Sequence, residues 1–291
     1  VHDQWAQTRN IPKNGGKTIE FRKYDQLPKA MTPLTEGVTP TGKEMNVTKI
    51  EATVKQYGDF IELSDLLILT AIDNNIVEAT TLIGSQAGRT LDTISREVLA
   101  AGTYVQYAEG QVTSRAALTP EMKLTVKAVK KAVRFLKKQN AKKINGYYYG
   151  IVHPDCSYDL TEDARWIDAV KYKNPERIYN GEIGEIEGAR FVETTEAKIW
   201  AKAGAAKSTS DTTKIDVYGT LIFGANAYAT TKIEGGGLKT IIKQLGSAGT
   251  GDPLDQRATV GWKALKVTEI LTEAYMIRIE TASTFSDGEA N

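Results

Sequence analysis

The side chains best suited to covalent or acid–base chemistry in this 291-residue chain are His153 and Cys156. They lie three residues apart, at the end of the aromatic segment GYYYGIVHP. A histidine that activates a cysteine makes a nucleophile, but such pairs need a third group to orient the histidine, and we recognise none in the sequence. We therefore interpret His153 as packed at the end of a strand and Cys156 as a small buried thiol.

Metal and nucleotide sites are also disfavoured. The chain has two histidines and one cysteine, too few to build a zinc site from histidine and cysteine ligands. A single cysteine also excludes an intramolecular disulfide. The stretch GGGLKT, residues 235–240, resembles a phosphate-binding loop. However, Ile233 and Leu238 stand where that motif requires glycine, so a glycine turn before a strand is the better interpretation.

Carboxylate chemistry finds little support in the sequence. No G-x-S-x-G motif occurs, and Glu185 and Glu187 alternate with apolar residues on a predicted strand. The hypothesis that two acids distant in the sequence cooperate in glycoside hydrolysis stays open, because a sequence does not show distances in space. We predict no catalytic residue, no cofactor and no metal ligand, and we keep an enzyme of unknown type as a rival hypothesis.

Charge and hydropathy exclude two further classes of partner. Lys+Arg 37 against Asp+Glu 36 leaves a net charge of +1, so no overall field attracts the chain to nucleic acid or to an anionic membrane. A lysine-rich helix expected over residues 119–140 is a local exception, although solvated lysines are common on such helices. The longest apolar run, near Leu66 to Leu69, is far shorter than the ~20 residues that span a bilayer.

The elements that would position these side chains are both helices and strands. Alternating patterns predict strands over 18–24, 47–55, 183–196 and 275–279, the pattern over 217–233 is that of a buried strand, and a further strand begins at Gly146. Apolar residues three and four apart predict a long helix over 74–100, and similar patterns predict helices over 119–140 and 154–172. Gly84 and Gly88 inside the long helix predict a close approach by a neighbouring element or a local bend.

The most unusual segment is the stretch of proline, threonine and glycine between the first two strands. It contains Pro28, Pro33, Gly37, Pro40 and Gly42, and it holds no histidine, cysteine or cluster of carboxylates. Long loops of this kind in compact proteins are usually functional. Because an isolated two-stranded hairpin is marginally stable in water, we expect this excursion to pack against another surface.

Several long phrases resemble the major capsid proteins of tailed bacteriophages, most closely the podovirus-type family with the Hong Kong 97-type fold. The phrases are GKTIEFRKYDQLPKAMTPLTEGVTP, QYGDFIELSDLLILTAID, QAGRTLDTISREVLAAGT and DPLDQRATVGWKALKVTEILTEAYMIRIE. They occur in the same order from about Asn10 to Ala282. The resemblance implies an α+β fold with an N-terminal arm, an extended β loop, a long spine helix, and peripheral and axial domains.

The resemblance also implies a domain layout and a set of partners. Residues 1–16 would form the N-terminal arm, 17–71 the extended loop, 72–118 and 232–291 the peripheral domain, and 119–231 the axial domain. The chain would assemble with itself into pentamers and hexamers in the host bacterial cytoplasm. The virion shell would enclose double-stranded DNA without sequence specificity, and portal, scaffold and decoration proteins would be further partners. No membrane is implied.

The residues that we predict at subunit interfaces come from the arm, the loop and the closing segment. They are Trp5, Phe21, Leu27, Pro28, Pro33, Leu34, Arg257 and Trp262. The alternative for each of them is ordinary packing inside one subunit. A monomeric extracellular binding or adhesin module is the second rival hypothesis, and the size of the protein in solution would separate it from a capsid subunit.

Overall fold

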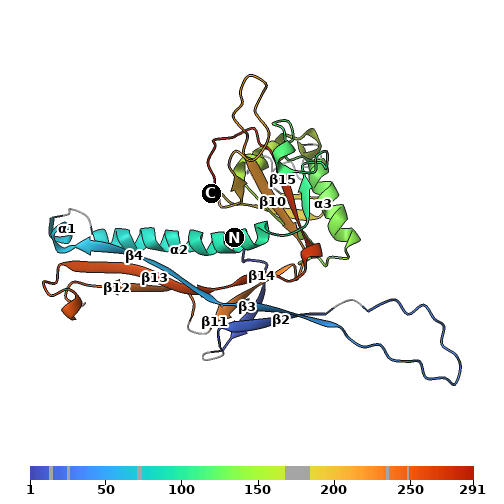
Figure 1. Cartoon of the computed structure of the whole chain (residues 1–291), viewed down its shortest axis with the longest axis horizontal. Helices are drawn as coiled ribbons and strands as arrows, with labels where there is room; N and C mark the ends of the chain where they lie inside the picture. The colour runs from blue at the N-terminus through green and yellow to red at the C-terminus, as the bar shows by residue number, and fades with distance from the viewer. Residues whose placement is uncertain (13–15, 25–26, 71–73, 168–183, 234–235, 248) are drawn as a thin grey trace.

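The computed structural model describes the chain except for residues 13–15, 25–26, 71–73, 168–183, 234–235 and 248. Helices and strands are mixed along it, as expected for an α+β protein. Figure 1 shows a long body made of one helix beside narrow sheets, a compact part with its own sheet and helices, and a loop that projects beyond the body. Within the described residues, no helix is both long and apolar enough to cross a membrane.

The long helix predicted over 74–100 is confirmed as α2, Asn75–Ala100. Its 26 residues span about 40 Å, because an α-helix rises ~1.5 Å per residue. Its buried stripe includes Ala79, Ile83, Ala87 and Leu99. A Cβ atom added at Gly84 or Gly88 would meet nothing within 4 Å, so the described chain makes no close approach to these glycines.

A three-stranded antiparallel sheet lies along α2. Its order is β12 (Lys239–Lys243), β13 (Arg257–Lys266) and β4 (Lys55–Ser64), and β13 and β4 pair from Arg257↔Ser64 to Lys266↔Lys55. Alternate residues of β13 are buried, and Trp262 and Ala264 cluster with Ile83 and Ala87 of α2. The short helix α1 (Asp65–Thr70) follows β4, and a 3-10 turn, η2, covers Gly249–Gly251.

Two small sheets join the long body to the rest of the molecule. β1 (Gln7–Ile11) runs parallel to β11 (Tyr228–Ile233), which also pairs with β14 (Thr268–Ile270). β2 (Thr18–Tyr24) and β3 (Val47–Thr53) form an antiparallel hairpin, as the alternating patterns predicted. The hairpin packs on the first sheet through one apolar cluster. This cluster contains Ile11, Ile19, Phe21, Ala52, Ala229, Val267 and Leu271.

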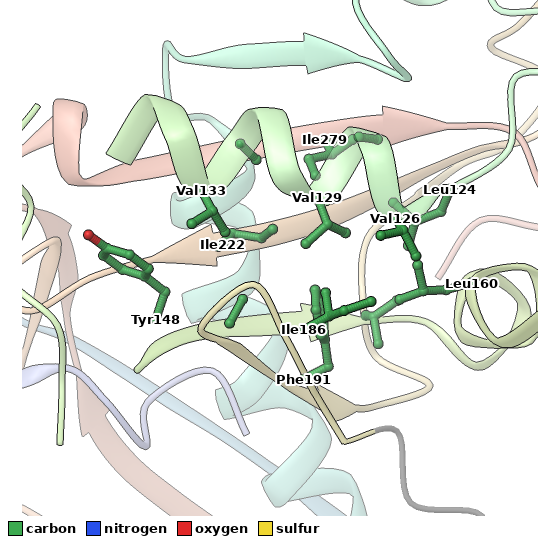
Figure 2. Packing of buried hydrophobic residues seen from close by; sticks show 14 of the residues in the cluster. Leu124, Val126, Val129, Val133, Tyr148, Leu160, Ile186, Phe191, Ile222 and Ile279 are labelled. Carbon is green, nitrogen blue, oxygen red and sulfur yellow. The ribbon is translucent and has the colours of Figure 1, made fainter. Parts of the chain in front are cut away.

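The compact part is built on a seven-stranded mixed sheet. Its strands are β5 (Val105–Tyr107), β15 (Met276–Thr281), β10 (Val217–Phe223), β6 (Tyr148–Val152), β8 (Ala189–Glu193) and β7 (Glu185–Ile186), with β9 (Ile199–Trp200) paired to β10. Figure 2 shows one face, where α3 (Val126–Lys138) packs on Ile222 and Ile279. α4 (Pro154–Glu162) supplies Leu160 to the same core, and two 3-10 turns, η1 (Arg115–Ala117) and η3 (Glu273–Tyr275), lie near the sheet.

The seven-stranded sheet contains strands from more than one of the segments that the resemblance assigns to separate domains. β5 and β15 come from outside residues 119–231, yet both are hydrogen-bonded into the sheet of β10 and β6. Likewise, β4 falls within residues 17–71 but pairs along its whole length with β13. These pairings join segments that are distant in sequence, and hydropathy patterns do not encode them.

Two helix boundaries were predicted wrongly, the start of α3 and the end of α4. Thr119 and Pro120 look like a helix start, but Thr119 only accepts a turn hydrogen bond from the Met122 amide, at 3.0 Å. Lys123 then forms a β-bridge with Ala282, and α3 begins after Thr125, whose Oγ1 accepts from the Ala128 amide at 3.2 Å. The helix predicted over 154–172 is present only in part: α4 ends at Glu162, the chain bends at Asp163, residues 164–167 are helical again, and positions 168–172 lie outside the described residues.

Candidate assembly surfaces

The loop between β2 and β3, here called the projecting loop (residues 27–46), extends away from the body of the molecule (Figure 1). It contains no helix or strand, and the hydrogen bonds seen in it join loop residues to each other. Lys43 Nζ donates to the Pro28 carbonyl at 3.3 Å, and the Val38 amide donates to the Thr35 carbonyl at 3.2 Å. The loop is therefore not packed on its own subunit.

Large apolar side chains of the projecting loop are exposed. Met31 is 81% exposed and Leu34 78%, and the set is Leu27, Met31, Leu34, Val38 and Met45. Pro28 and Pro33 are exposed as well. Clustered apolar exposure on a protein surface marks an interaction site, because water disfavours it. Four of the residues that we predicted at interfaces therefore lie exposed on the projecting loop: Leu27, Pro28, Pro33 and Leu34.

Phe21 anchors the base of the loop. Its side chain is 2% exposed, and it lies in the cluster that packs the hairpin against Ile11 of β1 and Ala229 of β11. This side chain has almost no surface left for a neighbouring subunit. It holds the hairpin in position, and the projecting loop continues from the open end of that hairpin, where Tyr24 pairs with Val47.

Trp5 is also packed within the subunit. Its ring stacks on Tyr149 with centroids 4.6 Å apart, and it lies 5.9 Å from Phe223. Beside it, His2 is fully buried, with Nδ1 2.8 Å from Asp92 Oδ2 on α2. Burial alone would raise the pKa of Asp92. The hydrogen bonds from His2 and its charge outweigh the effect of burial, so the pKa of Asp92 stays well below its usual range. The described N-terminal residues are thus held on their own chain.

Trp262 and Arg257 differ in exposure although both belong to β13. Trp262 is 4% exposed, faces α2, and donates from Nε1 to Gln86 Oε1 at 3.2 Å. Arg257 begins the strand with a side chain 51% exposed, and its Nε lies 3.6 Å from Glu62 Oε1. Arg257 is therefore available for contact with a neighbour, whereas Trp262 stabilises the packing of sheet and helix.

A second exposed apolar surface lies at the end of the body opposite the projecting loop (Figure 1). We call it the tip; it consists of α1 and residues 249–257, which meet where the Asp65 amide donates to the Gln256 carbonyl at 2.9 Å. Its exposed apolar side chains are Leu66, Leu67, Leu69 and Leu254. Our sequence reasoning missed this surface, although the run LLIL in so short a helix was a signal of it.

Comparison with known proteins decides what these surfaces belong to. The family model described as phage capsid protein matches residues 74–245, which is more than half of the chain. The chain belongs to the phage capsid protein family. Its function is therefore that of a capsid protein, which forms the shell of a phage particle, as the resemblance in the sequence predicted.

Solved structures similar to this capsid protein are themselves phage capsids. The capsid of Ralstonia phage GP4 has a TM-score of 0.70 at 13% identity and covers 98% of this chain and 88% of that chain. The capsid of cyanophage P-SCSP1u has a TM-score of 0.69 at 14% identity, covering 96% and 87%. The capsid of Helicobacter pylori bacteriophage KHP30 has a TM-score of 0.63 at 13% identity, covering 94% and 87%. The predicted Hong Kong 97-type fold is thereby confirmed. A search of curated proteins gave no match.

His153 and Cys156, which the sequence offers as a base and a nucleophile, have structural positions in this capsid protein. Cys156 is fully buried in the core beside Thr281 Oγ1, 3.7 Å away, and burial raises the pKa of its thiol far above the usual range. His153 caps α4 by accepting from the Asp155 amide at 3.2 Å, and burial lowers its pKa. The described residues contain no group of three or more side chains that could hold a metal ion.

Proposed function

We propose that this chain is the major capsid subunit of a tailed phage, assembling into the pentamers and hexamers of an icosahedral shell around double-stranded DNA. The exposed projecting loop is the observation that carries this proposal. Transfer of one Leu or Met side chain from water into an interface contributes roughly 1.5–3 kcal/mol. Several such side chains on one loop favour binding to a neighbouring subunit strongly.

The second support is that unlike surfaces occupy opposite ends of the molecule. The projecting loop extends from one end, and the tip, with the exposed Leu69, lies at the other. Contacts between unlike surfaces are heterologous, and they close into rings when the rotation between subunits allows it. Rings of five and of six subunits are the units that tile an icosahedral shell.

The proposed interface residues therefore fall into two groups. The residues that would contact neighbours directly are Leu27, Pro28, Pro33 and Leu34 of the projecting loop and Arg257 of the tip. The buried side chains would position these surfaces; they are Trp5, Phe21 and Trp262. The prolines reduce the conformational entropy that the loop loses when it is fixed on a neighbour.

The remaining partners follow from the same proposal. A subunit of this kind has no need of a catalytic residue or cofactor, so we infer a structural, non-enzymatic protein. Scaffold, portal and decoration proteins would bind the shell, and assembly would take place in the cytoplasm of the host bacterium. Packaged DNA would be bound through phosphates, without reading sequence.

The test is electron microscopy and light scattering of the purified protein, with a variant that lacks the projecting loop. Tyr24 and Val47 are directly paired, so replacing residues 25–46 by Asn-Gly would close the hairpin with a two-residue turn. We expect shells, tubes or rings from the wild type and a folded monomer from the variant. Circular dichroism and thermal melting would establish that the variant folds.

A matched control keeps the loop length and removes only its apolar character. Replacing Leu27, Met31, Leu34, Val38 and Met45 by Ser should abolish assembly as completely as the deletion does. If the Asn-Gly variant assembles as well as the wild type, the projecting loop is not an assembly element. A wild type that stays monomeric even when co-expressed with the phage's other head proteins would favour the monomeric binding module instead.

A further inference from the structure

The outward face of α3 is an unbroken strip of positive charge. Every exposed residue of this helix is a lysine or an arginine, and the apolar face lies in the core (Figure 2). The six residues are Lys127, Lys130, Lys131, Arg134, Lys137 and Lys138. At ~1.5 Å per residue they extend over about 16 Å. The whole chain has a net charge of only +1, so this strip is a strong local concentration of charge.

Carboxylates neutralise only the first part of the strip. Lys127 Nζ lies 2.6 Å from Glu109 Oε2, and Lys130 Nζ lies 2.9 Å from Glu187 Oε1. Arg134, Lys137 and Lys138, toward the end of the helix, form no ion pair with any residue that the structure describes.

The positive charge continues past the end of α3 into a cavity. Lys142, four residues after Lys138, lines a cavity of about 330 Å³ together with Arg22 and Lys23 of β2. The other lining residues are uncharged, among them Gln7, Asn226 and Tyr275. Arg22 also contacts Glu20, with Nε 3.1 Å from Oε1. Three cations from two separate segments, β2 and the chain after α3, thus converge at this cavity. We call the α3 strip and these three residues the basic track.

The composition of the basic track favours nucleic acid over protein as its partner. Protein–protein interfaces are depleted in lysine and enriched in aromatic and other apolar side chains at their centres. The exposed face of α3 is mostly lysine and presents no exposed apolar residue. Phosphate backbones are bound by arrays of Lys and Arg, with affinity from the release of counterions and no need for apolar contact.

The geometry points to the basic track as the surface that contacts the phosphates of packaged duplex DNA. This inference rests on the proposed function, and it adds an orientation. The exposed face of α3 lies on the inside of the shell. DNA is then held loosely along each subunit by charge, independently of its sequence.

The first test measures binding of a random-sequence DNA duplex to the purified full-length chain by fluorescence anisotropy over a range of salt concentrations. The variant is Arg134→Gln, Lys137→Gln and Lys138→Gln, because glutamine keeps the helix propensity and removes the charge. Each phosphate contact adds ~0.9 to the slope of log affinity against log salt. We expect the variant's slope to be shallower by about 2 to 3.

A charge-matched control removes three lysines elsewhere. Lys239, Lys243 and Lys263 are exposed on β12 and β13, and Lys239 pairs directly with Lys263. Their substitution by glutamine should leave the slope unchanged. Equal loss in both variants, or no loss in the α3 variant, would overturn the inference. Polyglutamate serves as a second probe, and binding of it as tight as that of the duplex would indicate an acidic protein partner instead.

The second test addresses orientation in assembled shells. Cys156 is buried, so a Lys137→Cys variant offers one reactive thiol for a maleimide on a polyethylene glycol chain too large to enter the shell. Labelling should be fast in unassembled subunits and blocked in shells. Fast labelling of intact shells would place α3 outside and overturn the inference, while the shells themselves would still support the proposed function. Failure of the wild type to form shells would instead count against that function.

Discussion

Arg115 and Glu280 form a bidentate ion pair where the long helix meets the seven-stranded sheet. Arg115 Nε lies 2.6 Å from Glu280 Oε2, and Arg115 Nη2 lies 2.7 Å from Glu280 Oε1. Glu280 is fully buried and also accepts from Arg278 Nε at 2.8 Å. Arg278 in turn donates to the Gly102 carbonyl at 3.1 Å and to the Ala100 carbonyl at the end of α2. The Glu280 carboxylate on β15 therefore holds Arg115 of η1 directly and is linked through Arg278 to the end of α2.

Removing that carboxylate's charge should destabilise the subunit strongly. Breaking one partner of a buried ion pair costs about 3–5 kcal/mol, because the remaining charge stays desolvated. We expect Glu280→Gln to lower the free energy of unfolding by about this amount, since both arginines lose their counter-charge. Urea titration of the soluble subunit would measure it. Glu289→Gln, on an exposed glutamate, is the control and should change little.

Acid should weaken the subunit through His153. Burial lowers the pKa of His153 below its ordinary value of 6.5, and the nearby Asp155 and Glu193 only partly offset this. The stability contributed by the neutral imidazole is therefore complete above pH ~6.5 and falls as the pH drops, because the unfolded chain then binds the proton more readily. Asparagine also caps helices but does not titrate. The melting temperature of His153→Asn should consequently fall less than that of the wild type between pH 7 and pH 5.5. Parallel curves would argue against this explanation.

Alanine should stabilise α2 at its two open glycines. A Cβ at Gly84 or Gly88 meets nothing within 4 Å, and glycine costs about 1 kcal/mol relative to alanine inside a helix. We expect Gly84→Ala and Gly88→Ala each to raise the free energy of unfolding by about 0.5–1 kcal/mol. A subunit that becomes more stable but assembles poorly would show that a neighbouring molecule needs these glycines.

The sequence predicts well whatever depends on local periodicity. α2 has an apolar stripe of seven turns, and β2 and β3 alternate with period 2, so their positions were correct within one or two residues. The start of α3 was wrong because two threonines, Thr119 and Thr125, both precede helix-like patterns. The β-bridge between Lys123 and Ala282 keeps the chain extended after Thr119, so the helix starts after Thr125. Residues so far apart in sequence leave no local signal of their pairing.

The interface residues show a different limit of sequence reasoning. The alternating pattern around Phe21 indicates that this side chain faces an apolar environment, and a large aromatic side chain such as that of Trp262 is usually packed, but neither signal says which chain provides the packing. The structure places both in the core of their own subunit. Leu27 and Leu34 have no periodic pattern around them, and their free exposure follows from the projection of the loop beyond the body. The tip was missed because three leucines in a short helix resemble ordinary core.

A single charge in the projecting loop should separate folding from assembly. Leu34 is 78% exposed in the subunit, so Leu34→Asp should leave the free energy of unfolding within about 0.5 kcal/mol of the wild type. In an apolar interface, however, the same carboxylate would lose its water and find no hydrogen-bonding or cationic partner, which costs several kcal/mol. We expect a folded subunit that forms no shells by electron microscopy. Thr41→Asp, which places the same charge on an exposed polar position of the loop, should assemble normally. If Leu34→Asp also assembles normally, Leu34 lies outside the interface and the loop contacts its neighbour through other residues.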